Sequence, residues 1–136
     1  MKHAIILMIL LATLLLISIL RPSRDFDVVA INSSESSLGS VKVSFKGFAF
    51  SFGSLSAKTG NSTYGGWSGT WPNEIAIEWE GMDDRGAQEA RLKLSDALAA
   101  KSDERLELVV EFAVDGLRAY PRVRESLTKG LKYRYR

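Results

Sequence analysis

The sequence predicts a mainly β domain, an antiparallel sandwich or half-barrel of about seven strands with one short helix, preceded by an N-terminal transmembrane helix. The first supporting observation is an apolar run over residues 4–20. The second is a series of later segments in which apolar and polar side chains alternate, the period of a half-buried strand. The third is the length, because 136 residues leave room for one small folded domain.

The apolar run is the first element of the chain. It comprises seventeen consecutive residues, with Thr13 and Ser18 as its weakly polar members. As a helix, at about 1.5 Å per residue, it spans roughly 25 Å, near the lower limit for crossing a bilayer. A cleaved signal peptide is the alternative, but no convincing Ala-x-Ala site follows the run. We therefore expect residues 1–24 to form an uncleaved signal anchor and residues 25–136 to form a single extracytoplasmic domain.

The charges beside the run bear on its orientation. Lys2 precedes it, and Arg21 and Arg24 follow it, so the basic residues on its two sides are nearly balanced. Because a very short basic N-terminal flank usually stays in the cytoplasm, we expect a single-pass inner-membrane protein with its β domain in the periplasm.

Strand-like segments follow one another along the rest of the chain. They cover residues 26–31, 41–52, 75–79, 90–94, 106–114, 117–124 and 131–135. Gly47 marks a turn or a bulge within the second segment. Asp115-Gly116 fits a tight hairpin turn, and Pro121 indicates an edge strand.

Two connecting segments have their own signatures. Residues 53–73 are dense in Gly, Ser, Thr and Asn, which predicts a long loop. Ser95-Asp96 is a plausible helix cap, and the good helix formers Ala97 to Lys101 follow it, which predicts the short helix.

Composition excludes several kinds of chemistry. The chain has no cysteine, and its one histidine is His3, so thiolate zinc sites, a cysteine nucleophile and a Ser-His-Asp triad are ruled out. The remaining candidates are carboxylates: Glu74, Glu78, Glu80, Asp83 and Asp84. Such groups can hydrolyse glycosides or bind calcium. However, they fall on an exposed strand face and in a polar turn, without the ligand spacing of a calcium loop. We expect no catalytic residue, metal site or cofactor, and no enzymatic activity.

Charge is unevenly distributed. Residues 74–117 carry twelve acidic and five basic residues, a net charge of −7, whereas residues 118–136 carry a net charge of +6. The two stretches could pair within the sheet, or the acidic one could steer a basic partner. The C-terminal KYRYR alternates bases with aromatic residues, which an edge strand explains, and we expect no nucleic-acid partner.

Large aromatic residues lie in the glycine-rich segment from Gly60 to Pro72. Tyr64, Trp67 and Trp71 are of the kind that anchor protein interfaces, although the tryptophans could instead cap the core. We take these three as candidate partner-binding residues. The candidate steering charges beside them are Glu78, Glu80, Asp83 and Asp84.

Short motifs resemble a domain-of-unknown-function family of small bacterial envelope lipoproteins. They are Gly65-Gly66-Trp67, Trp71-Pro72, the strand EIAIEWE, RLKL and ELVVEFAVDGLRAY, and they span roughly residues 45–125. The chain departs from that family in lacking the lipid-anchor cysteine and in having Leu94-Ser95 where the family has Leu-Pro. The family offers no catalytic residues to compare.

Some members of this family look like immunity proteins against lipase effectors of type VI secretion. The resemblance thus implies a periplasmic inhibitor, tethered to the inner membrane, that occludes a toxic effector. A structural or assembly subunit of an envelope complex is the alternative, and its transmembrane helix would then carry much of the binding.

Overall fold

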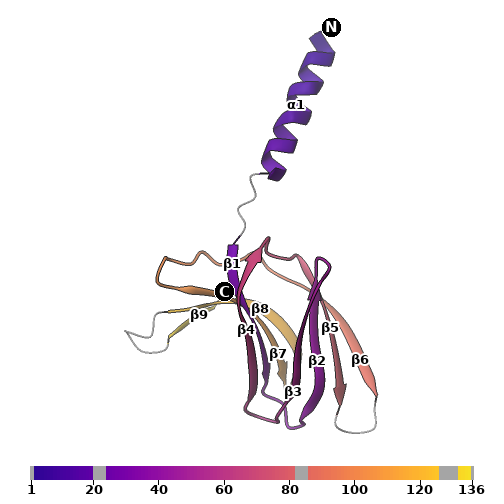
Figure 1. Cartoon of the computed structure of the whole chain (residues 1–136), viewed down its shortest axis with the longest axis vertical. Helices are drawn as coiled ribbons and strands as arrows, with labels where there is room; N and C mark the ends of the chain where they lie inside the picture. Colours follow the sequence, from indigo (N-terminus) through magenta and orange to yellow (C-terminus); the bar gives the residue numbers. More distant parts are fainter. Residues whose placement is uncertain (1, 20–23, 82–85, 126–131, 136) are drawn as a thin grey trace.

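A computed structural model of the chain describes residues 2–19, 24–81, 86–125 and 132–135. Within them lie one helix and nine strands (Figure 1). The elements are α1 (Lys2–Ile19), β1 (Arg24–Asn32), β2 (Leu38–Phe45), β3 (Phe48–Leu55), β4 (Gly60–Gly69), β5 (Glu74–Gly81), β6 (Ala87–Lys93), β7 (Arg105–Ala113), β8 (Gly116–Arg124) and β9 (Tyr133–Tyr135). The predicted mainly β class is confirmed, with more strands than the seven expected.

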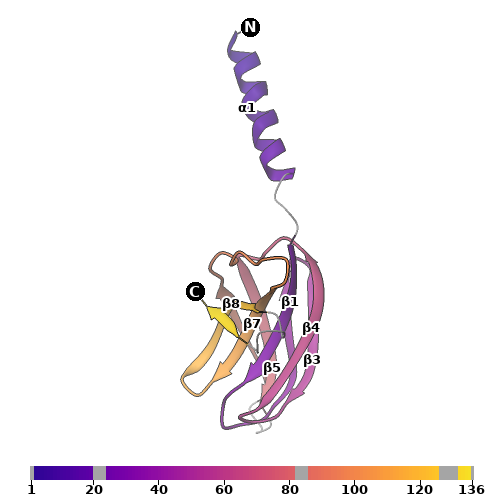
Figure 2. The ribbon, with the colours of Figure 1, turned by 90° about the vertical axis from the view of Figure 1, so that its left-hand side faces the viewer.

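The strands form two sheets packed face to face, as Figure 2 shows from the side. The five-stranded sheet has the order β4-β1-β7-β8-β9, and the four-stranded sheet has the order β3-β2-β5-β6. All neighbouring strands are antiparallel except β1 and β7, which are parallel, with Val28 opposite Leu108. The expectation of a wholly antiparallel arrangement was therefore wrong at this pair. β1 and β7 are neighbours in space but are separated in the sequence by all four strands of the second sheet, so no tight turn forces them to be antiparallel.

The core lies between the sheets and is filled by apolar side chains from both. Phe26 on β1 meets Phe45 on β2 at 6.1 Å between ring centroids, and Trp79 on β5 meets Phe112 on β7 at 5.3 Å. Alternation along β5 buries Ile75, as the sequence pattern predicted. Burial of this apolar surface is the main driving force for folding.

The loop predicted over residues 53–73 is wrong over most of its length. β3 continues to Leu55, and β4 occupies Gly60–Gly69 at the edge of the five-stranded sheet. β4 is held by backbone pairing with β1, and the bulge in that pairing places the Gly66 N–H 2.8 Å from the carboxylate of Asp27. Gly66 has φ of +71°, a conformation that glycine adopts without strain. An edge strand built on backbone bonds and glycine has no apolar alternation, so its composition resembled a loop.

The short helix predicted after Ser95 is also wrong, because residues 94–101 have no regular structure. The carbonyl of Ser95 accepts a hydrogen bond from the Trp71 indole at 3.0 Å, and that of Ala99 accepts one from Arg134 at 2.8 Å. Leu98 is buried in the core. A helix this short is unstable alone, so these tertiary contacts set the conformation instead.

The two strand signals near the end of the sequence agree with the structure. β7 and β8 form the expected tight hairpin, in which Ala113 pairs with Gly116. Pro121 pairs with Leu108 on β7, and pairing with the short β9 begins only at the next residue. Within the described residues, the side of β8 away from β7 therefore has no pairing strand up to Pro121. A proline has no backbone N–H to donate, so it fits this unpaired side of the strand.

Helix α1 extends away from the end of the sandwich at which β1 begins (Figures 1 and 2). The apolar side chains of residues 5–11 are more than half exposed. Of the helices in the described part of the chain, none combines the length and the apolarity needed to cross a membrane.

Candidate functional site

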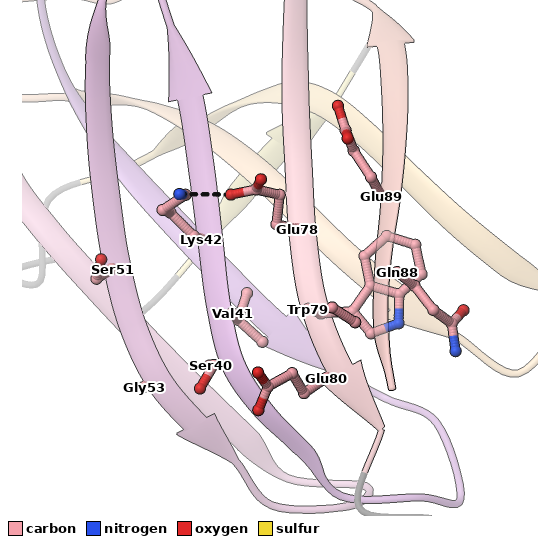
Figure 3. A pocket seen from close by; sticks show the side chains of 11 residues that line it. Ser40, Val41, Lys42, Ser51, Gly53, Glu78, Trp79, Glu80, Gln88 and Glu89 are labelled. Carbon is pink, nitrogen blue, oxygen red and sulfur yellow. Dashed lines mark ion pairs between the residues drawn. The ribbon is translucent and has the colours of Figure 1, made fainter. Parts of the chain in front are cut away.

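A groove of about 550 Å³ lies over the four-stranded sheet, and all four of its strands contribute (Figure 3). Its lining residues are Ser40, Val41, Lys42, Ser51, Gly53, Glu78, Trp79, Glu80, Ala87, Gln88 and Glu89. The three carboxylates and Lys42 come from strand positions that alternate with core residues such as Ile77, so they point to the outer face of the sheet. Gln88 lies opposite Trp79, at a position of the inward set. The groove is therefore open to solvent on a scaffold of paired strands.

Local backbone irregularity shapes the groove. The pairing of β2 with both neighbours shifts register between Leu38 and Lys42, which is the signature of a β-bulge. Within this bulge Ser40 has φ of +48°, an uncommon conformation for a residue with a side chain. Gly53 lies opposite Val41 and contributes no side chain. The bulge and the glycine together leave the space that the groove occupies.

The groove is acidic. Lys42 pairs with Glu78 at 2.5 Å between Nζ and Oε2, and Glu89 lies opposite Glu78 on the neighbouring strand. Glu80 is the third carboxylate, against one ammonium group. Salt bridges as exposed as the Lys42–Glu78 pair add little stability, so these charges are available for recognition.

The structure separates the predicted site residues into two regions. Glu78 and Glu80 lie together in the groove. Trp67 and Trp71 pack against the core, where Trp71 meets Phe26 at 5.0 Å between ring centroids. Asp83 and Asp84 lie outside the described residues.

Tyr64 lies between these two regions. Its ring packs between the rings of Phe50 and Phe52 on β3, and 45% of the residue is exposed. Its hydroxyl donates a hydrogen bond at 2.9 Å to the backbone carbonyl of Ser51, a residue that lines the groove. Tyr64 thus links the edge strand β4 to β3, on the opposite side of β3 from the groove's charged residues.

Sequence reasoning missed Lys42, Ser51, Gly53 and Glu89 as site residues. Lys42 and Ser51 were recognisable as outward positions of half-buried strands. Their meeting with Glu78 and Glu89 depends on the register of four strands, and a periodic pattern in one strand carries no information on register.

The charged segments pair across the five-stranded sheet. Arg122 bonds to Glu107 at 2.6 Å, Arg118 to Glu111 at 3.0 Å, and Arg134 to Glu104 at 3.1 Å. Each pair joins the acidic stretch 74–117 to the basic stretch 118–136. This confirms the expectation of neutralisation within the sheet for these residues.

A hydrogen-bonded cluster around Glu111 perturbs two pKa values. Burial acts to raise the pKa of Glu111, but hydrogen bonds from Arg118, Tyr120 and Ser33 outweigh it, so the pKa lies below its ordinary value. Burial, together with the bond to Glu111, raises the pKa of Tyr120 to about 12. These shifts belong to a structural network on the other sheet, outside the groove.

No group of three or more histidine, aspartate or glutamate side chains that could hold a metal ion occurs in the described part of the chain. Comparisons with known protein families, with curated proteins and with solved structures found no match. The assignment of the candidate site therefore comes from the geometry of the groove.

Proposed function

We propose that this chain is a membrane-tethered binding protein whose acidic groove receives a basic segment of a protein partner. The carrying observation is the groove itself, in which three carboxylates, Glu78, Glu80 and Glu89, share an open hollow with Lys42. The more specific form of the proposal is a periplasmic immunity protein that occludes a toxic effector, as the family resemblance implies.

The size and charge of the groove suit a basic side chain. Pockets that bind small groups measure about 300–1,000 Å³, and the groove falls in this range. Arginine is enriched at interface hot spots and bonds to carboxylates through two parallel donors. The carboxylates would also steer a basic partner during its approach.

The N-terminal helix supports the tether. Residues 4–20 are almost wholly apolar, and the described part of α1 exposes apolar side chains that the sandwich does not cover. Immersion in lipid would remove this surface from water. An inhibitor held at a membrane meets an effector that acts there at a raised local concentration.

The first experiment compares proteins captured from native cells by three tagged forms of the full chain in mild detergent: wild type, Glu80→Lys and Glu74→Lys. The matched control Glu74 lies on the same strand and face but outside the groove, beside Arg91. We expect a basic partner to be captured by wild type and by Glu74→Lys, and to be lost with Glu80→Lys. Capture of the same proteins by all three forms would contradict the groove as the contact.

A second experiment tests the immunity form. Once a toxic effector is captured, cells that lack this chain should die on exposure to it, and cells that express Glu74→Lys should survive. Survival of the cells that lack the chain would contradict the immunity proposal.

An envelope-assembly subunit is the second candidate function, favoured by the exposed apolar side chains of residues 5–11. Exchange of residues 2–19 for an unrelated membrane anchor distinguishes the two. A binding protein keeps its partner after the exchange, whereas a subunit that assembles through its helix loses its neighbours.

A further inference from the structure

The end of the sandwich at which β1 begins is held close to helix α1. Ile19 ends the helix and Arg24 begins β1, and five residue steps reach at most about 18 Å. If α1 is anchored in a membrane, this end of the sandwich must lie close to the lipid headgroups. The inference below therefore rests on the proposed tether.

The β2–β3 turn lies at this same end. β1 runs away from α1, and the pairing of Phe26, near its start, with Trp67 places the last part of β4 there. Phe48, the first residue of β3, stacks edge-on against Trp67 with ring centroids 4.4 Å apart. Figure 1 shows the turn between β2 and β3 at the end of the sandwich that faces the helix.

Phe48 is exposed where most aromatic side chains of this end are covered. It is 51% exposed, whereas its neighbours Phe26 and Phe45 are buried in the core. One side of the Phe48 ring packs against Trp67, which itself packs against the core, and the rest of the ring is exposed. Aromatic residues favour the boundary between lipid headgroups and acyl chains, since that region accommodates both apolar and polar contacts.

Lys46 lies beside Phe48 at the tip of the turn. Lys46 and Gly47 both have positive φ, +50° and +79°, as in a tight two-residue hairpin. The Lys46 side chain is exposed and has no ion-pair partner among the described residues. Acidic residues also occur at this end, including Asp25 and Glu104, and Glu104 is bonded to Arg134. Glu74 and Arg91 line the same hollow as Lys46 and Phe48, but they pair with each other at 3.6 Å. Among the described residues beside Phe48, the charge without an ion-pair partner is therefore that of Lys46.

We propose that the β2–β3 turn is a membrane-contact site, in which Phe48 enters the headgroup region and Lys46 pairs with anionic headgroups. This contact would fix the orientation of the sandwich on the membrane. The groove extends to Ser40, near the start of β2, and Glu80, near the end of β5, on the side of the sandwich away from α1. It would therefore stay open to a partner.

A depth measurement on the full chain in vesicles tests the proposal. The chain has no cysteine, so a single cysteine takes one fluorophore cleanly. The reporter is Ala49→Cys, which is exposed beside Phe48, and the matched control is Val114→Cys, which is 75% exposed at the far hairpin. The vesicles contain phosphatidylcholine, with or without phosphatidylglycerol, and a lipid carrying a nitroxide quencher on its headgroup.

We expect strong quenching of the label at position 49 and little at position 114. With the label at 49, Phe48→Ser should reduce quenching in both kinds of vesicle. Lys46→Gln should reduce it only with phosphatidylglycerol, where the loss of one charge shifts the docking equilibrium about fivefold. Lys46→Gln replaces an exposed side chain and should unfold at the same temperature as the labelled parent. Phe48→Ser also loses its contact with Trp67 and should unfold at a lower temperature, so circular dichroism checks that it is still folded at the temperature of the assay.

The outcomes separate the contact from the tether. A chain that does not float with vesicles of either kind overturns the anchor and with it the membrane contact. A chain that floats but shows equal quenching at positions 49 and 114 overturns the contact alone. Quenching at 49 that Phe48→Ser leaves unchanged also overturns it.

Discussion

Arg122 on β8 donates a hydrogen bond at 2.6 Å to Glu107 on β7, and both side chains are buried on the outer face of the five-stranded sheet. The ring of Tyr133 covers the pair, with the Arg122 guanidinium 4.1 Å from its centroid. Arg124 also approaches Glu107, at 3.5 Å. Removing one partner of a buried ion pair leaves the other charge without compensation, so the stability of this sheet depends on the pair staying complete.

Substitution of Arg122 by methionine tests this dependence. It leaves the buried Glu107 with a weaker partner, so we expect the free energy of unfolding to fall by about 3 kcal/mol. The measurement is urea unfolding of the full chain in detergent. Lys42→Met is the matched control, because it breaks an exposed pair, and it should cost less than about 1 kcal/mol. Equal losses in the two variants would show that burial of the Arg122 pair adds nothing.

Ionisation of Tyr120 should lower the free energy of unfolding at alkaline pH. Its pKa is about 12 in the folded protein, mainly through burial, against 10.0 for an ordinary tyrosine. A raised folded pKa contributes stability that is complete below pH 10 and is lost as pH rises from 10 to about 12. Tyr120→Phe should therefore flatten the fall in unfolding free energy above pH 10. If wild type and variant fall in parallel, Tyr120 is not the group responsible.

At Gly60, the first residue of β4, the backbone of Ser56 leaves no room for a side chain. A Cβ atom there would lie 2.4 Å from both the backbone N and the backbone O of Ser56, which cannot move independently. Gly60→Ala should lower the free energy of unfolding by about 3 kcal/mol through overpacking. Gly65→Ala is the control in the same strand, because its Cβ would meet Asp27 only at an ordinary 3.6 Å. Thermal unfolding followed by circular dichroism compares the two; similar midpoints would refute the close approach.

Blocking the groove provides a test of the proposed function that is independent of charge. Ser51→Trp places a large ring in the groove, and we expect it to abolish capture of the partner. Ser44→Trp adds the same ring on β2, on the same outer face but outside the groove, and should leave capture intact. Partner capture from native cells is the readout. Retention with Ser51→Trp would move the contact elsewhere on the molecule.

The success of the sequence predictions depended on how local each signal was. The strand containing Ile75 and Ile77 and the β7–β8 hairpin were predictable because alternation and turn chemistry act over a few neighbouring residues. β4 was missed because its glycines and polar residues lack that alternation, and its structure comes from backbone bonds to β1. The segment after Ser95 was assigned as a helix because its residues favour one, yet contacts from Trp71 and Arg134 hold it otherwise.

The candidate site shows the same limit. Glu78 and Glu80 could be identified as outward carboxylates from the pattern of one strand. That they lie beside Lys42, Ser51 and Glu89 could not be predicted, because this depends on the registers of three strand pairs and on a bulge at Ser40.

The sequence alone determines the mainly β class, the apolar N-terminal segment and the opposite charges of residues 74–117 and 118–136. Each of these follows from composition or from short-range periodicity. The parallel pairing of β1 with β7, the edge strand β4 and the groove arise only in the folded chain. They depend on contacts such as that between Asp27 and Gly66, which are 39 residues apart. Backbone hydrogen bonds between distant strands are nearly independent of side-chain type, so tertiary packing selects which of them form.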